Sequence, residues 1–169
     1  MKYTLAVLVE NRPGVLTHVS GLISRRAFNI ESIAASHTED PEMTRITIDV
    51  EADDELELEQ VVNQLSKLVD VIKIVNLTHV DSIERELALI KVKVSKLDRS
   101  DLVDIVEIFR AKVVDVNRDT MVIELTGEES KINAFCAVLA DFGIIEIVRT
   151  GKIAVSRGAL AAKDDASEC

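Results

Sequence analysis

The sequence predicts an α+β protein in which one unit, strand–helix–strand–strand–helix–strand, occurs twice. Hydrophobic residues make up 47% of the 169 residues but aromatic residues only 3%, so a core has to be built from Val, Ile, Leu and Ala. The many β-branched residues favour sheet. Segments in which apolar residues recur every second position, as in strands, and segments in which they recur about every 3.6 positions, as in helices, also follow the same order in both halves.

The first half begins with an apolar strand at residues 3–9 and a turn at 10–14. A helix is expected over 15–26, because its apolar residues recur at helical spacing and two arginines fall in its last turn, at the negative end of the helix dipole. A second strand is expected from Phe28 to about residue 38.

A proline-containing turn then leads to the clearest strand in the sequence, where Ile46, Ile48 and Val50 alternate with polar residues. A second helix is expected from Asp53, since acidic residues suit the positive end of a helix dipole. Residues 71–77 supply a fourth strand. This order of elements is the ferredoxin-like arrangement.

The same order begins again after a junction at residues 79–86. The expected elements are a strand at 87–94, a helix at 100–111, strands at 113–116 and 121–125, a helix at 128–142, and a closing strand or strands at 144–148 and 153–155. We therefore expect two domains, at 1–79 and 80–158. The tail at 159–169 has no periodic pattern and is expected to be disordered.

The charge of the chain argues against two classes of partner. The 30 acidic residues exceed the 20 basic ones, giving a net charge of -10, whereas nucleic-acid binding draws on clustered positive charge. The same excess disfavours anionic membranes, and no apolar run approaches the ~20 residues of a membrane span. Because a strand pattern starts at Tyr3, we expect no targeting segment and a cytoplasmic protein.

The side chains that could carry chemistry form no catalytic or metal-binding pattern. Cys136 and Cys169 support neither a disulfide framework nor a zinc site, and we expect both to be free thiols. The three histidines have no repeated ligand spacing. Nucleophile-elbow, Walker and dinucleotide glycine patterns are absent from the sequence. We therefore expect no metal and no catalytic centre in this chain.

Each predicted unit leaves one face of its sheet uncovered and its outer strands unpaired. A unit of about 80 residues also buries only ~60 to 65% of the surface that its unfolded chain exposes. Association through sheet edges or open faces would relieve both problems. We therefore expect a homodimer.

The turn VENRPGV at 9–15 could hold a ligand, because the first backbone N–H groups of a helix have no partner within the helix. Gly14 lets a ligand approach the backbone, and Asn11 and Asn29 can each donate and accept hydrogen bonds. A free α-amino acid needs such groups for its carboxylate and its ammonium. A purely structural interpretation is also open: Asn11 caps the helix, Gly14 permits a tight turn, and Asn29 turns the chain after the helix.

Longer stretches around this turn resemble a known family. LVENRPGVL at 8–16 and RAFNIES at 26–32 are similar to the ACT domain of the small, regulatory subunit of acetolactate synthase, also called acetohydroxyacid synthase. Other similar stretches are LVDV at 68–71, EREL at 84–87, EIFR at 107–110, VDV at 114–116, RTG at 149–151 and SRG at 156–158. The first motif indicates only an ACT domain, whereas the full series, over about residues 1–158, is specific to this subunit.

The resemblance implies a non-catalytic subunit that activates a large catalytic subunit, which condenses two 2-oxo acids in branched-chain amino-acid synthesis, and that confers feedback inhibition. Thiamine diphosphate, magnesium and FAD would then belong to the catalytic partner, and this chain would hold no cofactor. Valine, or a related branched-chain amino acid, would bind at the interface between two ACT domains. The residues assigned to that site are Asn11, Gly14, Val15, Asn29, Ile30, Ile33 and Ser36.

The corresponding turn in the second half, SKLDRS at 95–100, has no glycine and carries bulky or charged groups. We expect it to hold no second effector, with Asp98 or Ser100 as a helix cap and the second domain serving dimerisation and partner contact. Two other functions stay open. One is an acylphosphatase-type enzyme that uses Arg12, and the other is a free-standing amino-acid-sensing module that regulates a different enzyme.

Overall fold

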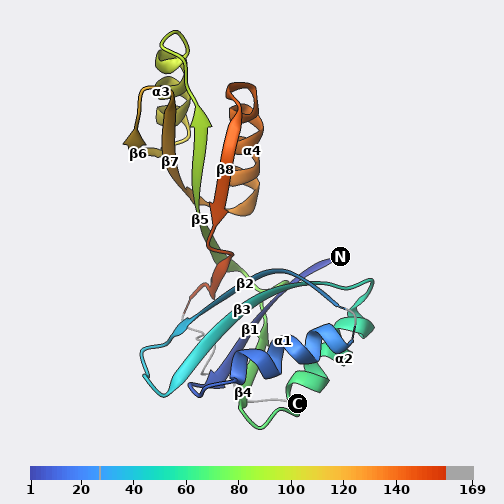
Figure 1. Ribbon diagram of the computed structural model, residues 1–169. Coiled ribbons are helices and arrows are strands. Elements are labelled where there is room, and N and C mark those ends of the chain that lie inside the picture. Colours follow the sequence, from blue (N-terminus) through green and yellow to red (C-terminus); the bar gives the residue numbers. More distant parts are fainter. Residues whose placement is uncertain (27, 159–169) are drawn as a thin grey trace. The chain divides into compact units, whose positions relative to one another are not determined.

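The computed structural model describes residues 1–26 and 28–158, and it divides into two compact units (Figure 1). Of the described residues, the first unit holds those up to 83 together with 152–158, and the second holds 84–151. Each unit has the order strand, helix, strand, strand, helix, strand, which confirms the predicted fold class. The expected tail and Cys169 lie outside the described residues.

The first unit contains a four-stranded antiparallel sheet with the order β2-β3-β1-β4. Its elements are β1 (Lys2–Glu10), α1 (Val15–Arg25), β2 (Asn29–His37), β3 (Met43–Glu51), α2 (Glu55–Leu65) and β4 (Val71–Asn76). In the central pair, the register runs from Lys2 opposite Glu51 to Glu10 opposite Met43. β2 and β4 are therefore the edge strands.

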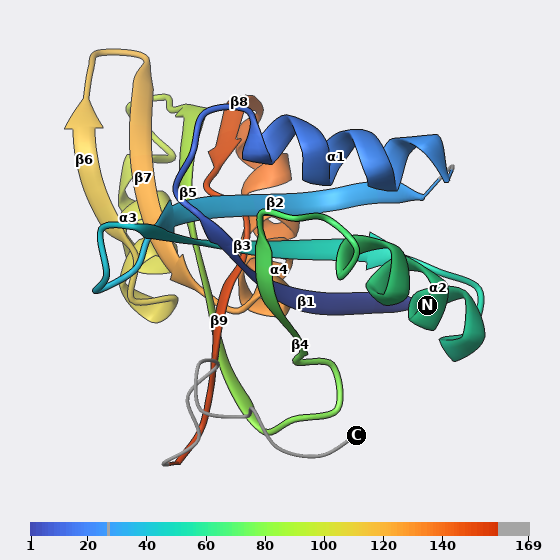
Figure 2. The same ribbon diagram turned by 90° about the horizontal axis from the view of Figure 1, so that it is seen from below.

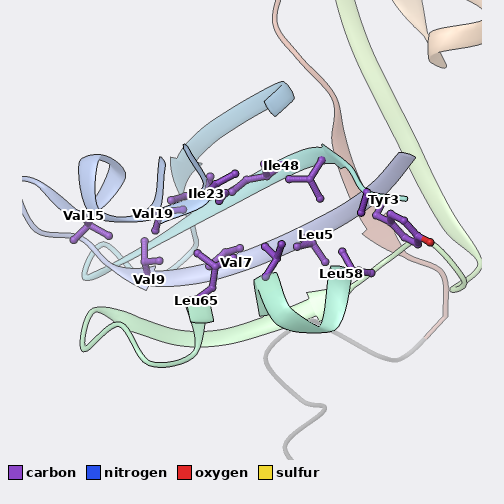
Figure 3. Packing of buried hydrophobic residues seen from close by; sticks show 14 residues of the cluster. Tyr3, Leu5, Val7, Val9, Val15, Val19, Ile23, Ile48, Leu58 and Leu65 are labelled. Atoms are coloured by element: carbon purple, nitrogen blue, oxygen red, sulfur yellow. The ribbon is translucent and has the colours of Figure 1, made fainter. Parts of the chain in front are cut away.

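Both helices of the first unit pack on one face of its sheet, as Figure 3 shows. Alternate residues of β1 point to this face because successive strand side chains point to opposite sides. The buried side chains of β1 on this face are Tyr3, Leu5, Val7 and Val9, and those of the helices are Val15, Val19, Ile23, Leu58, Val61 and Leu65. These are the strand and helix stripes that the periodicity predicts.

The second unit repeats this arrangement with the strand order β6-β7-β5-β8. Its elements are β5 (Ser82–Lys93), α3 (Arg99–Ile108), β6 (Lys112–Val116), β7 (Thr120–Gly127), α4 (Glu129–Leu139), the short 3₁₀ helix η1 (Ala140–Phe142) and β8 (Ile144–Arg149). β5 begins at Ser82, so the junction is shorter than expected. α3 ends before residue 111 because Arg110 adopts a left-handed φ of 54°.

A further strand, β9 (Ile153–Ser156), lies in the segment that we expect in the second domain, and the structure groups this segment with the first compact unit. It pairs with β5 but belongs to the first unit, where Lys152 and Ala154 are buried. We call residues 152–157 the strap. Residues of β1 and β3 on the sheet face away from the helices, such as Ala6 and Asp49, are also buried. The chain's own strap thus covers part of one face that we expected to need a partner.

Candidate effector site

The turn between β1 and α1 is fixed to two neighbouring connections. The backbone N–H of Glu10 donates to the carbonyl of Asp70 (2.9 Å), and that of Asn11 donates to the carbonyl of Glu42 (2.7 Å). The Asn11 amide group donates to the carbonyl of Pro41 (2.9 Å), while its oxygen accepts a hydrogen bond from Thr44 Oγ1 (3.3 Å). Asn11 therefore holds the β2–β3 connection against the turn, and the alternative interpretation, in which it caps the helix, is wrong.

The start of α1 has no side-chain cap. Gly14 occupies the N-cap position with a φ of 91°, and a Cβ added to it would meet no atom within 4 Å. The first backbone bond of the α-helical pattern is donated by His18 N to Gly14 O (3.0 Å). The N–H groups of Leu16 and Thr17 precede that bond, so they are available to an anion at an open helix end.

The structure sorts the assigned residues of α1 and β2 by exposure. Val15 is 4% exposed and packs in the core, and Ile30 is partly buried against the same core. Asn29, Ile33 and Ser36 are exposed on the edge strand β2. Their exposure leaves these three residues free to meet a ligand or a partner, whereas Val15 acts from beneath, by fixing the helix start.

Within one copy of the chain, the assigned residues form two groups at opposite ends of the sheet. Asn29 pairs with Glu51, which pairs with Lys2 at the start of β1. The turn follows Glu10, eight residues or about 27 Å further along the strand. Figure 2 shows α1 and β2 side by side, and because they run in opposite directions the start of one lies at the end of the other. Asn11, Gly14 and Ser36 therefore lie at one end, and Asn29 and Ile30 at the other.

Local pattern analysis missed the residues that hold Asn11 in place. Pro41 and Thr44 are about 30 residues away in sequence, so no local motif could have linked them to the turn. The Arg12 side chain forms an ion pair within the turn, because its Nε lies 3.0 Å from Glu10 Oε2. A carboxylate beside this guanidinium competes with a phosphoryl group for it and gives no support to an acylphosphatase site.

The corresponding turn of the second unit is closed by its own side chains. Ser95 Oγ donates to Asp98 Oδ2 (2.5 Å) and accepts hydrogen bonds from the N–H groups of Leu97 and Asp98 (3.2 Å each). Asp98 is the N-cap residue of α3, but its side chain makes no hydrogen bond to the helix. The expected capping by its side chain is therefore not seen.

The buried carboxylate of Glu86, in the second unit, has a structural partner. Arg149 makes two hydrogen bonds to Glu86, of 2.7 and 2.6 Å, and this bonding raises the pKa of its guanidinium. Burial raises the pKa of the neighbouring Cys136 thiol. Because the thiolate is the reactive form, Cys136 has the character of a core residue.

Within residues 1–26 and 28–158, no three His, Cys, Asp or Glu side chains are grouped closely enough to hold a metal ion. In the same residues, no helix is both long and apolar enough to cross a membrane.

The fold and this turn define an ACT-type protein, with two ferredoxin-like units in tandem. Family models agree: residues 5–73 match the ACT domain of acetohydroxyacid synthase small subunits, and residues 85–158 match the small subunit of acetolactate synthase.

Similar proteins cover nearly the whole chain. A probable acetolactate synthase small subunit from Archaeoglobus fulgidus is 50% identical, over 94% of this chain and 98% of that protein. The acetolactate synthase small subunit from Mycolicibacterium smegmatis is 49% identical, over 92% and 91%. The crystal structure of the acetolactate synthase small subunit from Thermotoga maritima matches with a TM-score of 0.85 at 40% identity, over 95% and 99%. This chain belongs to the acetolactate synthase small subunit family.

Proposed function

We propose that this chain is a non-catalytic regulatory subunit of acetolactate synthase in the cytoplasm. It activates the thiamine-diphosphate catalytic subunit and reduces that activity when valine, or a related branched-chain amino acid, binds to its first unit. Family membership supports the enzyme assignment. The position of the effector site rests on the geometry of β2 and of the turn before α1.

The observation that carries this proposal is the separation of the two groups of assigned residues. Two copies can pair their β2 edges in antiparallel fashion, because β2 has an unpaired edge in the first unit. With the two-fold axis near Ile33, the midpoint of β2, Asn29 of one copy comes opposite His37 of the other. His37 pairs with Thr44, which binds Asn11. Homodimerisation therefore joins the two half-sites into one.

Each half of the composite site supplies what a zwitterion needs. The open N–H groups of Leu16 and Thr17 suit the carboxylate, and the positive end of the helix dipole favours its charge. The Asn29 side-chain oxygen accepts from the ammonium group, since its Nδ2 already donates to Glu31 Oε1 (2.6 Å). Ile33, 37% exposed, offers an apolar contact to a branched side chain.

Control of the catalytic subunit follows from differential binding. An effector between two copies favours one arrangement of the first units, and it shifts activity only because its affinity differs between arrangements. Linkage then requires the catalytic subunit to change the effector affinity by the same factor, typically ~5 to 150-fold. Activation and inhibition thus both depend on the same equilibrium between arrangements of the first units.

The experiment combines calorimetric titration of the purified chain with an activity assay of the enzyme reconstituted with its catalytic subunit. Gly14→Asp places a carboxylate at the open helix end and should abolish both valine binding and inhibition while activation remains. Gly14→Asn is the matched control, because Asn has the same size and also tolerates a left-handed φ. It should retain binding more fully than Gly14→Asp.

A Gly14→Asp variant that valine inhibits as strongly as the parent chain would show that the site lies elsewhere. Failure of the chain to activate any acetolactate synthase catalytic subunit would instead favour a free-standing amino-acid sensor that regulates another enzyme. Co-purification of the large subunit separates these two results.

A further inference from the structure

The strap is fastened to the first sheet by a buried ion pair. Lys152 Nζ lies 3.0 Å from Asp49 Oδ1 and donates to Thr4 Oγ1 (2.7 Å). The Thr4 hydroxyl donates in turn to Asp49 Oδ1 (2.7 Å). The side chains of Lys152 and Asp49 are only 9% and 2% exposed. Burying two charges is costly, so this cluster holds its geometry only while every member stays bonded.

The backbone of Lys152 reaches the strand to which we assign the effector. Its N–H donates to Ser32 Oγ (3.0 Å). Ser32 stands opposite Asp49 in the β2–β3 register, directly after an irregularity that falls between Ile30 and Ser32. On the sheet face away from the helices, Lys152 therefore binds β3 through its side chain and β2 through its backbone N–H.

The far end of the strap holds the other chain segment that leads to the second unit. Arg157 N donates to the carbonyl of Asp81 (2.8 Å), and its Nε lies 3.1 Å from Asp81 Oδ1. Asp81 immediately precedes β5, which continues into the second unit, and Lys152 immediately follows Gly151, the last residue of that unit. The strap thus begins at one of the two connections between the units and binds the other at Asp81.

We propose that Lys152 is a positioning residue that transmits effector occupancy from β2 to the strap, and so to both connections with the second unit. This inference rests on the proposed function, because it needs an effector at β2. The irregular, edge-lying start of β2 is the part of the sheet that a ligand can shift most easily. The ion pair beneath it is the rigid element that such a shift has to move.

Hydrogen exchange of the purified full chain, with and without saturating valine, tests the coupling. In the parent chain, valine should slow exchange about threefold or more in peptides from both β2 and the strap. Ser32→Ala removes only the strap's bond to β2. The double variant Lys152→Met, Asp49→Leu replaces the ion pair by apolar groups, an exchange that is often neutral for stability. In both variants β2 should still respond to valine, but the strap should respond less than about 1.5-fold.

The same variants should separate binding from inhibition. Their calorimetric affinity for valine should stay within about threefold of the parent, while the maximal inhibition of the reconstituted enzyme falls by half or more. Ser66→Ala, at an exposed position outside the strap, is the matched control and should respond like the parent. A merely structural role for Lys152 would lower stability without changing the strap's response to valine.

The possible failures are distinguishable. If the parent chain binds no valine, the proposed function falls. If valine binds and slows exchange in β2 but not in the strap, the proposed function stands and the role of Lys152 is overturned. Full inhibition in both the Ser32→Ala chain and the double variant would also overturn it.

Discussion

At Gly14 the backbone has a φ of 91°, in the region where a Cβ causes strain, although the space around it is empty. The glycine is therefore required by conformation, and the open space is what a ligand can use. Asn11 illustrates the opposite case, because its role is set by Pro41 and Thr44 from another connection. A residue's conformational need can be inferred from sequence, whereas its partners cannot.

Alanine substitutions at two glycines should change the free energy of unfolding in opposite directions. Gly14→Ala should lower the free energy of unfolding by about 1 kcal/mol, because an alanine is strained at a left-handed φ. Gly21→Ala, within α1, should raise it by about 0.5–1 kcal/mol, since its φ is not left-handed and its Cβ has room. Urea denaturation at one fixed protein concentration measures both. Equal effects of the two substitutions would contradict the assigned backbone of the turn.

The partly buried Cys136 thiol should be slow to alkylate. Its raised pKa, caused by burial, lowers the thiolate fraction at every pH below that pKa, and burial also limits access. In a Cys169→Ser background, iodoacetamide at pH 8.5 should modify the folded chain at least about threefold more slowly than the urea-unfolded chain. Equal rates would place the thiol in solvent.

At the scale of single elements, helix ends follow local chemistry closely. The acidic run before α2 contains its cap: Asp54 is the N-cap residue, and its Oδ1 accepts from Glu57 N (2.8 Å). Glu57 reaches back to Asp53 N (2.6 Å). Such reciprocal bonds involve neighbours in sequence, which is why the start of this helix was predictable to within two residues.

Asp54→Ala should cost about 1 kcal/mol, because it removes the acceptor for an N–H group at the start of α2. Asp53→Ala is the control, since there it is the backbone N–H that bonds, and its effect should stay within about 0.5 kcal/mol. Thermal unfolding followed by circular dichroism would detect the difference. Equal losses would mean that general charge, and not the cap, stabilises this helix start.

The two ends of the strap are held by ion pairs that we expect to contribute unequally to stability, because the pair at Lys152 is buried and the pair at Arg157 is exposed. Asp49→Ala removes one partner of the buried ion pair with Lys152 and should cost about 3–5 kcal/mol. Asp81→Ala removes the partner of the exposed Arg157 and should cost about 1 kcal/mol or less. Chemical denaturation of both variants provides the comparison. A small loss for Asp49→Ala would indicate that the strap leaves the sheet readily.

At the scale of the whole molecule, the proposed dimer predicts a concentration-dependent assembly. Ile33→Lys places a charge at the middle of the β2 edge, and charges there oppose edge-to-edge pairing. Sedimentation velocity at micromolar concentration should give a dimer for the parent chain and a shift toward monomer for Ile33→Lys. Val114→Lys, on the β6 edge of the second unit, is the control. Dissociation by Val114→Lys alone would move the interface to the second unit.

The sequence by itself determined the order of the elements and the composition of both cores, because periodicity and capping are properties of neighbouring residues. It also determined the glycine turn and the family, through motifs read along the chain. Only the tertiary structure decided that residues 152–157 pack against the first sheet and that Asn29 lies far from Gly14. Both facts depend on which distant segments come into contact, and that is fixed by burial and hydrogen bonding across the fold, not by any local pattern.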